Sequence, residues 1–419
     1  MACGLRHKTF LTFVLASALA GCSGGGATPN APQRLPDAHA TVGRSSSPET
    51  ILYAFKGGSD GAFPYAGLYA DKSGDLFGTT DGGGSSDLGT VFKFSASGSE
   101  SVVHSFKGAP DGALPYSTLV EGKKGVLYGT TYSGGAFDDG CAFELVPTAS
   151  GYLENVIYSF SGSAGDGGNP YAGLLYDAKS GALYGTTLYG GAYGPGSVFK
   201  LVPTPSGWTE SIVYSFEGGS DGAIPYAGLV EDKSGALYGT TILGGPGGNG
   251  TVYKLTPASG SYTESILYGF TGTNGDGQYP FGTLTASGAY LYGTTLDGGA
   301  NGDGLVFAVK AKGGSNAESA LYSFQGGNDG ANPMGGVIVA KGGTLYGMTS
   351  NGGEYSAGTL FALTRTHKTY AESVVYAFGG YPDGGSPFGG PIETKSGTLE
   401  GLTFNGGYDG DGTIFAVTP

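Results

Sequence analysis

Cysteine, histidine and basic residues are all scarce in this chain, and each shortage excludes a class of protein. Three cysteines cannot build a disulfide scaffold. Four histidines give no histidine-rich metal cluster, and we expect no cofactor. Only 20 Lys and Arg accompany 34 Asp and Glu, so the net charge of −14 repels phosphate backbones and excludes nucleic acid as a partner.

Glycine and the aromatic residues are abundant instead. The 419 residues include 86 Gly, 29 Tyr and 22 Phe. A disordered glycine-rich chain would lack the aromatics, and collagen would show a period of three residues. The composition therefore favours an all-β protein in which glycine turns join many short strands.

The first 21 residues have the pattern of a signal peptide. Arg6 and Lys8 precede an apolar stretch over 10–19, which is too short to span a bilayer as a permanent helix. The tetrapeptide Leu-Ala-Gly-Cys that ends at Cys22 resembles the lipobox of bacterial lipoproteins. That resemblance implies removal of residues 1–21 and acylation of Cys22, which would attach the chain to a membrane through lipid.

Residues 22–48 are expected to form a lipidated, flexible tether. They contain mostly Gly, Pro, Ser and Ala, and their few large apolar residues cannot form a core. Ser23 stands where the lipoprotein resemblance would need Asp for retention in the inner membrane. We therefore expect an outer-membrane lipoprotein of the bacterial envelope, either periplasmic or surface-exposed.

Residues 49–419 repeat themselves seven times. The sequence Leu-Tyr-Gly-Thr-Thr, or a degraded copy of it, begins at Leu76, Leu127, Leu183, Leu237, Leu291, Leu345 and Leu399. An Asp followed four residues later by Pro also recurs in register, at Asp60, Asp111, Asp166, Asp221, Asp276, Asp329 and Asp383. A period of about 53 residues is slightly longer than that of kelch propellers.

Each repeat contains four strand-like runs, which predict one propeller blade. In the fourth copy they cover 225–230, 236–241, 250–255 and 264–270, and turn residues separate them. The first complete strand of the chain, 49–55, is of the fourth type, and the last, 412–419, is of the third type. The two ends can complete one blade together, so we predict a monomeric seven-bladed β-propeller with four antiparallel strands per blade, closed by its N-terminal strand.

The repeat resembles that of the "choice-of-anchor tandem repeat GloVer-containing" proteins of bacteria. The resemblance covers 49–419 and depends on Leu-Tyr-Gly-Thr-Thr, Gly-Gly and Asp-Gly-x-x-Pro. It implies an exported surface protein and carries over no activity.

Strand order predicts which loops share a face. In an antiparallel blade, the loops between the second and third strands emerge at the same end as the Asp-Gly turns that lead into each blade. We call this surface the Gly-Gly face. Its blade-specific residues are our candidate ligand contacts: Asp87, Asp138, Asp139, Tyr193, Asn249, Asp303, Tyr355, Tyr408, Asp409 and Asp411.

The seven turn aspartates allow two interpretations. They could form a ring that holds a cation or a polyol, or each Asp could accept hydrogen bonds within its own turn. Repetition in every blade favours the structural role. We expect no cofactor, with calcium as a weaker alternative. The carboxylates beside the aromatics could coordinate Ca²⁺ through oxygen, but no segment matches an EF-hand loop.

The sequence offers few signs of catalysis. His104 occupies a slot that Tyr holds in the other copies, and Cys141 occupies a slot of Thr or Ser, so both suit packing. No nucleophile elbow or phosphate loop is present. We favour a binding module for a glycan or an envelope protein, with a carbohydrate-active enzyme that uses paired carboxylates and an envelope scaffold as alternatives.

Overall fold

The computed structural model describes residues 49–311, 318–367 and 369–419. The predicted signal peptide, Cys22 and the tether lie outside these residues. Within the described ranges, no helix is both long and apolar enough to span a bilayer. The only helical element described is the single 3₁₀ turn η2 (Lys123–Gly125).

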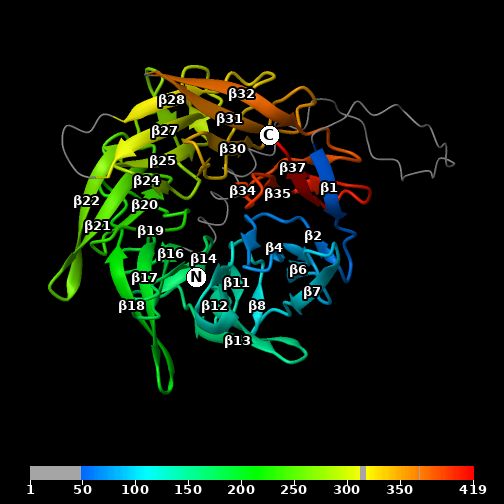
Figure 1. The fold of residues 1–419 in the computed structure, drawn as a ribbon. Coiled ribbons are helices and arrows are strands. Elements are labelled where there is room, and N and C mark those ends of the chain that lie inside the picture. The colour runs from blue at the N-terminus through cyan, green and yellow to red at the C-terminus, as the bar shows by residue number, and fades with distance from the viewer. Residues whose placement is uncertain (1–48, 312–317, 368) are drawn as a thin grey trace, which may run out of the picture. The chain divides into compact units, whose positions relative to one another are not determined.

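Residues 49–419 form a seven-bladed β-propeller, which confirms the predicted fold (Figure 1). Each blade has a short inner strand and three longer ones, all antiparallel. Blades 1 to 4 consist of β3 (Tyr69–Ala70), β4 (Leu76–Thr80), β6 (Thr90–Phe94), β7 (Glu100–Ser105); β9 (Val120–Glu121), β10 (Leu127–Thr131), β12 (Cys141–Thr148), β13 (Gly151–Ser159); β15 (Leu175–Tyr176), β16 (Leu183–Gly190), β17 (Ser197–Thr204), β18 (Gly207–Ser215); β19 (Val230–Glu231), β20 (Leu237–Thr241), β21 (Thr251–Ala258), β22 (Ser261–Gly269).

Blades 5 and 6 follow the same order. They consist of β24 (Thr285–Ser287), β25 (Tyr290–Thr295), β27 (Leu305–Lys310), β28 (Ser319–Ser323); β29 (Ile338–Val339), β30 (Leu345–Thr349), β31 (Thr359–Thr366), β32 (Thr369–Ala377). Blade 7 is built from both ends of the propeller: β34 (Ile392–Glu393), β35 (Leu399–Thr403), β37 (Thr413–Val417), β1 (Glu49–Ala54).

The pairing of β1 with β37 closes the ring as the sequence predicted. The register aligns Glu49 with Val417 and Ala54 with Thr413, so the N-terminal strand is the outer strand of the last blade (Figure 1). Every blade thereby has at least its four strands, with β14 as a fifth strand in the sheet of blade 3, and none is left incomplete.

Two-stranded ribbons bring the Asp-Gly turns against the Gly-Gly loops. They pair β2 (Gly61–Ala62) with β5 (Gly82–Gly83), β8 (Gly112–Ala113) with β11 (Ser133–Gly134), β23 (Gly277–Gln278) with β26 (Asp297–Gly298), and β33 (Gly384–Gly385) with β36 (Asn405–Gly406). In blade 3, β14 (Gly167–Pro170) pairs with β16 in the same way. The turns and loops therefore share the Gly-Gly face, as strand order required.

The innermost strands are shorter than the sequence predicted. The prediction of a first strand over 225–230 was wrong, because β19 covers only Val230–Glu231. Pro225 has no N–H for a ladder, and the N–H of Gly228 donates instead to Thr283 Oγ1 of the next blade at 3.0 Å. The chain near the axis therefore bonds between blades rather than within one.

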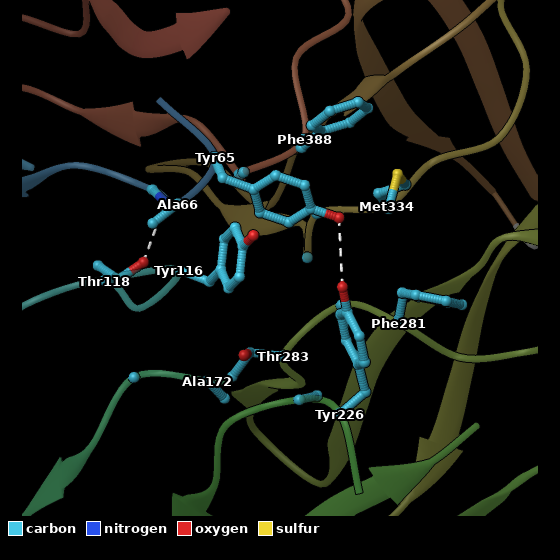
Figure 2. Close-up of a pocket in the computed structure, with 18 of the residues that line it drawn as sticks. Tyr65, Ala66, Tyr116, Thr118, Ala172, Tyr226, Phe281, Thr283, Met334 and Phe388 are labelled. Carbon is cyan, nitrogen blue, oxygen red and sulfur yellow. Dashed lines mark hydrogen bonds between the residues drawn. The ribbon is translucent and has the colours of Figure 1, made fainter. Parts of the chain in front are cut away.

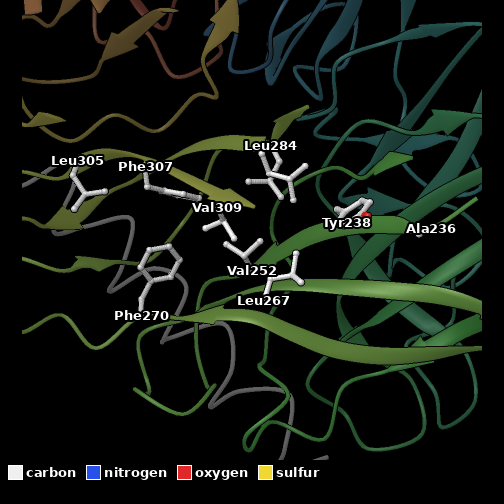
Figure 3. Close-up of a cluster of buried hydrophobic side chains, with 10 residues drawn as sticks. Ala236, Tyr238, Val252, Leu267, Phe270, Leu284, Leu305, Phe307 and Val309 are labelled. Atoms are coloured by element: carbon white, nitrogen blue, oxygen red, sulfur yellow. The ribbon is translucent and has the colours of Figure 1, made fainter. Parts of the chain in front are cut away.

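The hydrophobic core lies between the blades. One buried cluster combines Tyr238 and Val252 of blade 4 with Leu305 and Phe307 of blade 5 (Figure 3). The repeated glycine of the Leu-Tyr-Gly-Thr-Thr run makes room for an aromatic ring, since a Cβ on Gly293 would lie 2.5 Å from Phe307 Cζ. Both faces of each blade are covered, which explains why the strands do not alternate between apolar and polar residues.

Candidate functional site

Each turn aspartate is bonded within its own turn and to the strand before it. Asp60 Oδ2 accepts hydrogen bonds from Tyr53 Oη at 2.9 Å and from the N–H of Lys56 at 3.0 Å. The same tyrosine contact recurs at Asp166, Asp221, Asp329 and Asp383. Asp276 accepts from Thr271 N and Oγ1, and Asp111 contacts His104. These bonds hold the entrance to every blade.

A glutamate lies beside six of the seven turn aspartates, and the sequence analysis missed these glutamates. Burial, followed by the charge of Asp60, raises the pKa of Glu100 to about 7. Burial also raises the pKa to about 7 at Glu154, Glu210, Glu264, Glu318 and Glu372. A signal was present, because a Glu precedes the Tyr or His slot by four residues in all seven repeats, Glu49 included.

Three predicted contacts support the loops of the Gly-Gly face. Asp87 Oδ1 accepts the N–H of Gly83 at 2.9 Å, and Asp138 Oδ1 accepts that of Gly134 at 3.1 Å. Asn249 Nδ2 donates to Thr271 O at 2.8 Å. These polar groups are engaged inside the protein and have less capacity left for a ligand.

Three further aspartates join each loop to the next blade through their backbones. The carbonyls of Asp139, Asp303 and Asp411 accept the N–H groups of Asn169, Asn332 and Phe63, at 2.7, 2.8 and 2.8 Å. Burial raises the pKa of both Asp303 and Asp411.

Aromatic side chains project from the Gly-Gly face. Tyr193, Tyr355 and Tyr408 are 62%, 59% and 70% exposed, and Asp409 beside Tyr408 is exposed as well. The structure adds Phe137 and also Tyr381, whose ring centroid lies 6.5 Å from that of Tyr408. Tyr381 comes from the turn that contains Asp383, in which the sequence analysis considered only the aspartate. These five are the most exposed aromatics among the described residues.

The propeller axis holds a second feature, a cluster of large side chains that the sequence reasoning missed. Each follows the repeated proline of one blade. They are Tyr65, Tyr116, Tyr171, Tyr226, Phe281, Met334 and Phe388. Tyr116 and Tyr171 stack with ring centroids 4.6 Å apart. The hydroxyls of Tyr65 and Tyr226 hydrogen-bond at 3.2 Å (Figure 2). The sequence could have revealed this cluster, because a large side chain follows the repeated proline in every blade.

A cavity of about 260 Å³ lies against this aromatic cluster. Its other walls include small and aliphatic residues that follow the aromatics along the inner segments, such as Ala66, Thr118 and Thr283 (Figure 2). Tyr171 and Tyr226 are buried, whereas Thr283 is exposed. The inner segments run away from the Gly-Gly face, so the cavity opens on the opposite face.

Asp81 is a carboxyl group near the aromatic cluster, and the sequence reasoning passed over it. Burial, with a smaller contribution from Asp87, raises the pKa of Asp81 to about 7. Its charge acts on Tyr65 and Tyr116. Asp81 is the first residue of the loop between the second and third strands of blade 1. No other blade has a carboxylate at this position, which could have marked Asp81 from the sequence. The equivalent residues are Tyr132, Leu188, Ile242, Leu296, Ser350 and Phe404.

Sequence comparison identifies one family. A family model described as the Gloeobacter/Verrucomicrobia repeat matches residues 41–180 and 175–415. No curated protein matches the sequence.

Solved structures share the fold at low sequence identity. A puromycin-hydrolyzing peptidase from Mycobacterium tuberculosis is 10% identical with a TM-score of 0.50, over 84% of this chain and 51% of its own. A hypothetical selenium-binding protein from Sulfolobus tokodaii is 9% identical with a TM-score of 0.50, over 74% of this chain and 79% of its own. A structure described as a 6-phosphogluconolactonase from Bacteroides uniformis is 13% identical with a TM-score of 0.45, over 81% and 89%. The two likenesses with a TM-score of 0.50 show the propeller fold alone.

Proposed function

Because the chain belongs to the Gloeobacter/Verrucomicrobia repeat family and folds as a seven-bladed propeller, we propose that it is a lipid-anchored envelope module that binds a glycan through its Gly-Gly face. The exposed aromatics support this proposal. Phe137, Tyr193, Tyr355, Tyr381 and Tyr408 are 59–72% exposed and belong to loops or turns of that one face. Aromatic rings with nearby carboxylates suit the apolar faces and the hydroxyls of sugars.

Single aromatic substitutions test the proposed surface. Removing a central aromatic contact typically costs about 2 kcal/mol, so Tyr355→Ala and Tyr408→Ala are each expected to weaken glycan retention roughly 30-fold. Retention on a panel of immobilised polysaccharides is the measurement. Tyr290→Ala is the matched control, because Tyr290 is 39% exposed and begins β25 at the opposite end of its blade.

The same panel distinguishes the rival functions. Release of reducing or unsaturated ends would support a carbohydrate-active enzyme, for which the carboxyl group of Asp81, with its pKa of about 7, suits a general acid. Indifference to every glycan would favour a protein partner or a structural scaffold. If Tyr290→Ala lost as much glycan retention as Tyr355→Ala and Tyr408→Ala, the assignment of binding to the Gly-Gly face would be contradicted.

The anchor is tested separately. A Cys22→Ser variant is expected to lose palmitate labelling and to leave the membrane fraction, because the acceptor thiol is gone. Metabolic labelling followed by fractionation is the measurement. A serine variant that still incorporates palmitate would contradict the lipobox interpretation.

A further inference from the structure

The outer strand of blade 1 departs from the repeat at one chemically important position. The hydroxyl group that bonds the turn aspartate comes from tyrosine in the other repeats, whereas His104 of β7 fills this slot before Asp111. A phenol donates a hydrogen bond, while a neutral imidazole can also offer a lone pair to a metal ion. The corresponding tyrosines are Tyr53, Tyr158, Tyr214, Tyr268, Tyr322 and Tyr376.

Three ligand-type side chains converge there. His104 Nε2 lies 3.3 Å from Asp111 Oδ2, and one carboxylate oxygen of Glu154 completes a group whose atoms all lie within 4.8 Å of one another. Asp111 is held in place because its two oxygens accept the N–H groups of Gly112 at 2.7 Å and Lys107 at 3.0 Å. The arrangement is therefore positioned by the backbone of its turn.

Glu154 brings a buried carboxylate oxygen to this group. Its Oε1 atom has no hydrogen-bond partner in the described part of the chain. The same holds for the equivalent atoms of Glu100, Glu210, Glu264, Glu318 and Glu372, so the histidine is what distinguishes this site. A buried oxygen without a partner is costly, and a metal ion would satisfy it. A metal ion can still reach this group from solvent, since the side chains of His104 and Asp111 are each 17% exposed.

We propose that His104, Asp111 and Glu154 bind a divalent transition-metal ion, with zinc as the best-suited ion. One imidazole and two carboxylates form a nitrogen and oxygen ligand set that suits zinc, and three protein ligands leave a position open for water or a ligand. Calcium prefers six to eight oxygen ligands and suits this set less well. No other group of three such side chains lies this close together within the described ranges.

The bound ion would connect two blades. His104 lies on β7 of blade 1, Asp111 lies in the turn between blades, and Glu154 lies on β13 of blade 2. Binding to the folded state alone raises its stability by mass action. We therefore expect zinc to raise the Tm of the protein as well as to bind stoichiometrically.

Metal titration of the chelator-treated protein tests the proposal. The wild type is expected to bind one equivalent of Co²⁺ with the visible absorption bands of a protein site, and Zn²⁺ should displace it and raise the Tm. His104→Tyr installs the residue of the other repeats, so the variant is expected to fold, to bind Co²⁺ at least 100-fold more weakly and to lose the Tm rise. Glu154→Gln keeps the shape of the side chain and should weaken binding in the same way.

His367→Ala is the matched control, because His367 is exposed in a turn and is absent from the ligand group. It should bind Co²⁺ as the wild type does. Absence of stoichiometric Co²⁺ binding by the wild type, or equal binding by wild type and His104→Tyr, would overturn the proposal.

Discussion

Deleting residues 49–55 is expected to abolish cooperative folding of the propeller and to make the protein aggregate. The deletion removes β1, which supplies the outer strand of blade 7 and pairs with β37 from Glu49 to Ala54. Blade 7 would then present β37 as an unpaired edge, which is a template for association with another chain. Urea unfolding followed by circular dichroism, together with gel filtration, measures both effects.

A point substitution separates packing from strand pairing. Phe55 is fully buried, and its ring contacts Phe92 of blade 1 edge-on with centroids 5.0 Å apart. Phe55→Ala is therefore expected to cost about 3–5 kcal/mol of unfolding free energy. Leu153→Ala is the control, because Leu153 is 56% exposed and should change stability by less than about 0.5 kcal/mol. An unchanged urea midpoint after deletion of 49–55 would contradict closure of the ring by β1.

The closed ring could be predicted because it depends on the order of strand types along the chain. A fourth-type strand at 49–55 and a third-type strand at 412–419 complete one blade without any knowledge of packing. The inner strands could not be delimited in this way. Gly228 bonds to Thr283 of the neighbouring blade, and a contact between blades leaves no trace in the local pattern of either repeat.

The loops of the candidate site could likewise be predicted from strand order, whereas the contacts near the axis could not. Strand order placed the loops that hold Tyr355 and Tyr408 on one face, and the exposure of both rings is a local consequence of loop tips. The axial cluster escaped notice because the direction in which Tyr171 and Tyr226 point is fixed only when blades converge. Contacts between carboxyl groups of different repeats, such as Asp60 with Glu100, are likewise set by blade packing.

Those carboxyl pairs predict an unusual dependence of stability on pH. Glu210, Glu264 and Glu372 keep their protons in the folded protein up to a pKa of about 7, because burial and then a neighbouring aspartate disfavour the charge. In the unfolded chain they ionise near the ordinary value of 4.5. The stabilisation is therefore complete below about pH 4.5 and is lost as the pH rises through about 7, since the unfolded state binds fewer protons in that window.

The size of this effect follows from the number of equivalent sites. A difference of one bound proton between the folded and unfolded states changes the unfolding free energy by about 1.4 kcal/mol per pH unit. Solvent screening of these half-buried side chains reduces the effect. We therefore expect each glutamate to lower the unfolding free energy by about 1 kcal/mol between roughly pH 5 and pH 8. Six repeats carry such a raised pKa, so the unfolding free energy should fall by several kcal/mol across that range. Urea midpoints at a series of pH values give the measurement.

A triple variant isolates the glutamates from the general charge of the protein. Gln at 210, 264 and 372 has the shape of the protonated acid and cannot ionise, so the variant should lose about half of the decline in stability between roughly pH 5 and pH 8. The exposed residues Glu217, Glu354 and Lys233 supply a matched surface control, because Gln at these positions should leave the pH profile unchanged. A wild-type stability that stays constant or rises over this window would show that the buried glutamates do not hold their protons in the folded propeller.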